Sequence, residues 1–109
     1  MTDLATHLAD VKKYTGSVDE AAVAGMAKTY ALVLSKADSR WVAASDPAEL
    51  GRVRDNFLKK KLGLKDADAT LDAAIKAVVD KLKADRTKSR LTVYYLLAEH
   101  FKKLDLFKK

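Results

Sequence analysis

Apolar side chains recur along this chain at intervals of three, four and seven residues, the spacing that places them on one face of a helix. The pattern is clearest over residues 17–34, where Ser17 and Glu20 form a capping box at the helix start. This regularity predicts five helices and almost no strand. They are expected at residues 3–14, 17–34, 46–62, 66 or 68 to 84, and 89–104.

Strong boundary signals flank the third predicted helix. Asp46 can cap it, Pro47 suits its first position, and Glu49 follows in its first turn. Gly63 comes directly after its last residue and can adopt the left-handed conformation that ends a helix. The preceding residues 38–44 fit either an extended segment or one short helical turn, and the turn would raise the number of helices to six.

The last predicted helix, residues 89–104, is apolar around most of its circumference. Such a helix is usually covered by others, so we expect it at the centre of one compact orthogonal bundle, with Leu97 and Phe101 buried. Leu106 and Phe107 follow as apolar residues that dock the end of the chain on the core.

Length and composition agree with one helical domain over residues 1–109. The chain has a mass of 12.0 kDa, with 49% hydrophobic and 33% charged residues. It contains no cysteine, which excludes disulfides and thiolate metal ligands. The acidic N-terminus has no signal-peptide pattern, and the apolar stretches are too short to span a bilayer. We therefore expect a cytoplasmic protein without membrane contact.

Positive charge is concentrated in the second half of the chain. Residues 1–50 contain five Lys or Arg against seven Asp or Glu, whereas residues 51–109 contain sixteen against eight. A basic half suggests a polyanion such as nucleic acid as a partner. The same cations also lie at predicted helix C-termini, where they complement the helix dipole without any ligand. The candidate polyanion-binding residues are Lys59, Lys60, Lys61, Arg86, Lys88 and Arg90.

Residue types that usually carry chemistry do not gather into a motif. Asp66–Asp72 is the nearest match to a calcium-binding loop, but Leu71 replaces the glycine of the turn and Ala77 replaces the terminal bidentate glutamate. His7 and His100 have no second histidine one helical turn away, so a surface or boundary role is the more common one for them. The sequence therefore assigns no catalytic, cofactor-binding or metal-ligating residue, and an enzyme is less expected than a binding protein.

Similarity to known proteins is carried by four segments: Ser45–Leu50, Val53–Leu64, Asp85–Arg90 and Tyr94–Glu99. Taken in order, they resemble the DUF2853 family of small bacterial proteins, a domain of unknown function. The resemblance implies a single all-helical domain with an EF-hand-like arrangement of helices and no calcium sites. It implies no activity, cofactor or functional residue.

Three functions remain open from the sequence. The leading hypothesis is a non-enzymatic protein that acts through contact with another protein or with a second copy of itself, which requires an exposed apolar patch. The alternative is a polyanion-binding module with salt-dependent affinity. The third is an enzyme whose site is assembled from scattered side chains, which would need a pocket with perturbed titratable groups.

Overall fold

The chain folds as an all-α protein, as the sequence predicts, and its described residues also include one short strand pair. The computed structural model describes residues 4–16, 18–34, 36, 41–42, 46–82 and 88–108. Two-residue strands β1 (Trp41–Val42) and β2 (Lys88–Ser89) pair antiparallel. The helical elements are α1 (Leu4–Lys12), α2 (Glu20–Thr29), α3 (Ala31–Leu34), α4 (Pro47–Arg52), η1 (Val53–Lys61), α5 (Asp68–Lys81), α6 (Arg90–His100) and η2 (Leu104–Phe107).

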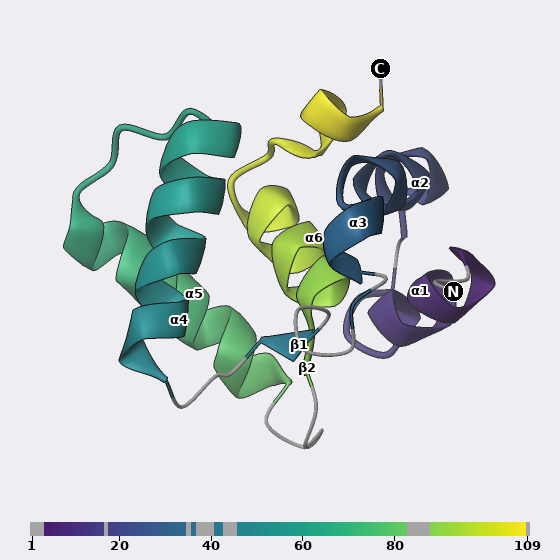
Figure 1. Cartoon of the computed structure of the whole chain (residues 1–109), viewed down its shortest axis with the longest axis horizontal. Coiled ribbons are helices and arrows are strands. Elements are labelled where there is room, and N and C mark those ends of the chain that lie inside the picture. The colour runs from purple at the N-terminus through teal and green to yellow at the C-terminus, as the bar shows by residue number, and fades with distance from the viewer. Residues whose placement is uncertain are drawn as a thin grey trace.

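Helix α6 occupies the centre of the molecule. In Figure 1 it lies between α4 and α5 on one side and α1 to α3 on the other. Every residue from Leu91 to Ala98 is buried, so this helix is covered around its whole circumference. Leu97 is fully buried and Phe101 packs partly buried against the core, which confirms the predicted central helix.

Polar groups within the buried part of α6 are hydrogen-bonded to neighbouring segments. The Thr92 hydroxyl donates to the carboxylate of Asp10 in α1. The Tyr95 hydroxyl accepts from the backbone N–H of Asp19, just ahead of α2, at 2.8 Å. Because an unpaired buried polar group would be costly, these bonds fix how α1 and α2 sit against the central helix.

The third predicted helix is present with the expected boundaries. The Asp46 side chain accepts a hydrogen bond from the backbone N–H of Ala48 at 2.9 Å and caps α4. From Val53 the same helix continues as the π-helix η1. It ends at Lys61 with Leu62 as its C-cap, and Gly63 follows with a φ of 68°, the left-handed conformation expected of a terminating glycine.

The second predicted helix is shorter than expected at its start and broken near its end. It begins at Glu20, where Asp19 caps it in place of Ser17, which lies outside the described residues. Asp19 is as good a capping residue as serine and stands nearer to the first regular turn. The helix then breaks at Tyr30, whose ring packs edge-on against an aromatic ring of α6 with 5.1 Å between centroids.

The fourth predicted helix and residues 38–44 are only partly covered by the described residues. The fourth helix begins at Asp68, the later of the two predicted starts, and ends at Lys81; residues 83–84, where its end was expected, lie outside the described residues. Of residues 38–44, only Trp41 and Val42 are described, and they are extended.

Helix α6 ends at His100, four residues earlier than predicted. Lys102 adopts a positive φ of 58°, and the N–H of Lys103 bonds to the carbonyl of Ala98 at 2.7 Å. This is the Schellman arrangement, with a lysine in the position that glycine usually takes. The chain therefore turns out of the helix and leads into the short η2.

The C-terminal segment docks through one of the two apolar residues expected to do so. Phe107 is buried in an aromatic cluster with Phe57 and Tyr30, whereas Leu106 is 42% exposed, contrary to the prediction. Adjacent residues of a helical turn face different directions, so only one of them can enter the core. The backbone of Phe107 lies so close to α2 that Gly25 fits there only because it lacks a Cβ.

We predict that Gly25→Ala destabilises the protein by about 1–3 kcal/mol, the usual range for overpacking. An added Cβ would lie 1.6 Å from the carbonyl oxygen of Phe107, a backbone atom that cannot rotate away. Urea denaturation measures the change. Gly16→Ala is the control, because a Cβ there meets nothing within 4 Å; equal stability of the two variants would contradict the close contact.

Candidate functional site

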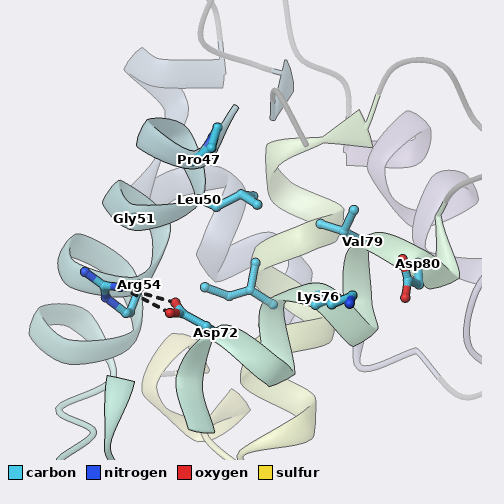
Figure 2. Close-up of a pocket in the computed structure, with 9 residues that line it drawn as sticks. Pro47, Leu50, Gly51, Arg54, Asp72, Lys76, Val79 and Asp80 are labelled. Atoms are coloured by element: carbon cyan, nitrogen blue, oxygen red, sulfur yellow. Dashed lines mark hydrogen bonds and ion pairs between the residues drawn. The ribbon is translucent and has the colours of Figure 1, made fainter. Parts of the chain in front are cut away.

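A groove of about 580 Å³ runs between α4 and α5. Figure 2 shows Leu50 of α4 and Val79 of α5 pointing into the space between the two helices. Both side chains are only partly buried, while Ile75 beneath them belongs to the core. The floor of the groove is therefore apolar. The full lining is Pro47, Leu50, Gly51, Arg54, Asp72, Ile75, Lys76, Val79 and Asp80.

One end of the groove is bounded by an ion pair between η1, which continues α4, and α5. Arg54 Nη1 lies 3.3 Å from a carboxylate oxygen of Asp72, as the dashed lines in Figure 2 mark. The guanidinium also bonds through Nε to its neighbour Asp55 at 2.9 Å. The hydrogen bond to Asp55 is the main reason why the pKa of Arg54 is raised, with further support from Asp68 and Asp72. Arg54 is thus paired with Asp55 and Asp72 at one end, and the rest of the groove stays open.

Two charged side chains on the α5 side of the groove have no such partners. Lys76 and Asp80 are exposed and stand four residues apart on one face of the helix. Among the residues that the structure describes, neither forms an ion pair or a side-chain hydrogen bond. This edge of the groove thus presents one cation and one anion to solvent.

Gly51 lies in the middle of the α4 side of the groove, where the helix would be more stable with almost any other residue. A Cβ added there would meet nothing within 4 Å. Glycine inside a helix costs roughly 0.5–1 kcal/mol relative to alanine. In contrast to Gly25, no neighbour within the described chain requires the missing side chain, so the groove keeps open space directly above the α4 backbone.

A mostly buried ion pair fixes the start of α4 to the start of α6. Arg90 Nη2 lies 2.5 Å from Glu49 Oε1, and Arg52 Nη2 lies 2.9 Å from Glu49 Oε2. The side chains of Glu49 and Arg90 are only 10% and 13% exposed. Burial opposes ionisation of Glu49, but the hydrogen bonds from Arg90 and Arg52 outweigh it and hold the pKa of Glu49 below its usual value. This pair positions one wall of the groove.

The candidate polyanion-binding residues are separated where the structure describes them. Lys59 is bound to Asp68 at 2.5 Å, Lys60 is exposed, and the Lys61 ammonium lies 5.5 Å from the centroid of the Phe107 ring. All three lysines lie at the end of η1. Arg90 instead lies beside the first turn of α4, at the opposite end of this continuous helix, and is engaged by Glu49 and by the Tyr94 hydroxyl. Arg86 and the side chain of Lys88 lie outside the described residues.

The two histidines lie apart from the groove. His7 is buried in α1, and His100 is exposed at the end of α6, beside shallow hollows along α5. In the described part of the chain, no three His, Cys, Asp or Glu side chains are grouped so that they could hold a metal ion. No described helix combines the length and apolar content that a membrane crossing requires.

No residue of this groove was assigned a function from the sequence. The only local signal was Gly51, a glycine within a segment predicted to be helical. Lys76 and Asp80 read as ordinary surface charges, because their position beside the groove depends on how α5 packs against α4.

The fold and this groove define a small all-helical protein with an open apolar groove between two of its surface helices. The chain belongs to the family described as protein of unknown function (DUF2853), whose model matches residues 6–105. No curated protein matches the sequence. The family membership confirms the resemblance seen in the sequence and assigns no activity to the groove.

Replacing Glu49 should remove a pH-dependent contribution to stability. The pKa of Glu49 is lower in the folded protein than its ordinary value of 4.5. Its contribution is therefore fully present above that value and is lost as the pH falls through the lower, folded-state pKa. We predict that Glu49→Gln costs about 3 kcal/mol at neutral pH, because it leaves Arg90 without its carboxylate.

The measurement is urea denaturation of wild type and variant as a function of pH. The difference between them should shrink as the pH falls below 4.5. Arg52→Gln is the matched control: its side chain is 60% exposed, so its loss should cost less than about 1 kcal/mol. A Glu49→Gln effect that does not change with pH would contradict the role of the ionised carboxylate.

Proposed function

We propose that this is a non-enzymatic protein-binding module whose α4–α5 groove receives an α-helix of a partner. The observation that carries the proposal is the open space above Gly51. A glycine that weakens its own helix and serves no internal packing is explained by close approach of a backbone from outside. Without a side chain at this position, a second helix can approach the α4 backbone directly.

The chemistry of the lining supports a helix as the bound element. Leu50, Val79 and Pro47 offer apolar contacts on the two walls of the groove, and the lining also includes charged side chains. An amphipathic helix fits such a groove by placing its apolar residues inside and its polar residues at the rim. Covering the exposed parts of Leu50 and Val79 would contribute hydrophobic free energy in proportion to the apolar area removed from water.

The other two functional classes have less support. Polyanion binding needs accessible cations on one surface, whereas Lys59 and Arg90 are already engaged with carboxylates at opposite ends of one helix. Catalysis would need groups inside a pocket whose perturbed pKa suits proton transfer. The lowered pKa of Glu49 arises from a structural ion pair outside the groove, and the raised pKa of Arg54 inside it keeps that side chain a cation. We keep the bacterial cytoplasm as the proposed location, as the sequence led us to expect.

A glycine substitution separates folding from binding at this groove. We predict that Gly51→Ala raises the free energy of unfolding by about 0.5–1 kcal/mol, because alanine favours the helix and has room for its methyl group. Gly51→Leu should also fold, since leucine is a good helix former, but its side chain should fill the groove and abolish binding. Thermal denaturation reports the stability of both variants.

Binding is tested with a photo-crosslinking amino acid placed at position 79 in cells that express the protein natively. We expect one defined adduct, identified by mass spectrometry and reproduced with the purified partner, that disappears in Gly51→Leu. The same crosslinker at position 28, on the far side of α6, is the control. Equal labelling from both positions, or an adduct that persists in Gly51→Leu, would overturn the proposal.

A further inference from the structure

We infer that the partner helix is α5 of a second copy of this chain, docked antiparallel across a twofold axis that passes between Lys76 and Asp80. This inference rests on the proposed function of the groove and names its occupant. It is carried by three features of the groove: two charges on its edge that pair with no other described residue, the balance of charge in its lining, and the open space above Gly51.

The unpaired charges are self-complementary. Lys76 and Asp80 are one helical turn apart on α5 and both belong to the lining of the groove. When two identical helices pack antiparallel about a twofold axis midway between these positions, the lysine of each copy meets the aspartate of the other. One contact therefore occurs twice, as in every isologous interface. A partner with a single sign of charge would meet repulsion at one of the two side chains.

The lining of the groove is electrically balanced in a protein that is otherwise strongly basic. It contains two cations, Arg54 and Lys76, and two anions, Asp72 and Asp80. The whole chain has a net charge of +6, so two copies carry the same net charge and repel each other on average. The α4–α5 groove is a place where two copies can meet without adding to that repulsion, and charges farther away than about 8 Å are screened at physiological salt.

The packing surface next to these charges also suits a second helix. Val79 is half-buried, and Ala77, on the adjoining outward face of α5, is exposed and small. On the other wall, the absent side chain of Gly51 leaves space for the residues of the incoming helix. Apolar contacts in the groove would then supply the association free energy, and the reciprocal ion pairs would fix its register.

Charge exchange at the two positions provides the test. Lys76→Glu leaves two anions on the edge, and Asp80→Lys leaves two cations, so each variant alone brings like charges together across the axis. Sedimentation equilibrium is measured over protein concentrations from about 1 μM to about 1 mM, the range of weak to moderate association. We expect dimers for the wild type and a loss of affinity of more than about tenfold for each single variant.

Two combinations then identify the second copy as the partner. The double variant K76E/D80K restores opposite charges across the axis and should dimerise as the wild type does. An equimolar mixture of the two single variants should form a heterodimer, although neither associates alone. Lys28→Glu, an equal charge change on α2, is the control and should leave dimerisation unchanged. Circular dichroism establishes that every variant is folded.

The outcomes separate this inference from the proposed function. A wild type that stays monomeric throughout, single variants that dimerise normally, or a double variant and a mixture that remain monomeric would each overturn the second copy as occupant. If position 79 crosslinks in cells to a different protein and the wild type is monomeric, the groove is still a docking site but its partner is not this chain. If crosslinking at position 79 fails as well, the proposed function falls too.

Discussion

The structure depends on the complete burial of one helix. Eight consecutive residues of α6, Leu91 to Ala98, are removed from water, which no single neighbouring helix can achieve. Other elements must therefore surround it, as Figure 1 shows, and the polar groups within it must be bonded to them. Thr92 and Tyr95 meet this requirement through α1 and the start of α2. The positions of the surrounding helices therefore follow from two requirements of α6: its apolar surface must be covered, and its buried polar groups must be hydrogen-bonded.

The α4–α5 groove is a consequence of this arrangement. The first turn of α4 is held to α6 by the pair Glu49–Arg90, and α5 packs on α6 through apolar residues such as Ile75. Both helices thus face the centre, and η1, the continuation of α4, is joined to α5 by the ion pairs Arg54–Asp72 and Lys59–Asp68. Between these contacts and the Glu49–Arg90 pair the groove stays open. An apolar floor remains exposed because the core is already complete beneath it.

Local signals in the sequence predicted much of this fold but none of the groove. Asp46 and Gly63 act within one or two turns of their own position, so their roles as cap and terminator can be inferred without tertiary information. Arg90 was grouped with the basic residues because its partner is 41 positions away in the chain. The break at Tyr30 is likewise accompanied by a ring contact with α6 that no local pattern reveals.

Two helical glycines differ in whether a neighbouring residue of the fold excludes a side chain at their position. Gly25 is required by the chain itself, because the backbone of Phe107 occupies the place of its Cβ and thereby joins the C-terminal segment to α2. Gly51 has no such neighbour, yet it lies within a helix that it weakens. Internal packing explains the first, whereas no neighbour among the described residues explains the second. Under the proposed function, a contact made from outside is the explanation, and the groove around Gly51 is where a partner helix would make it.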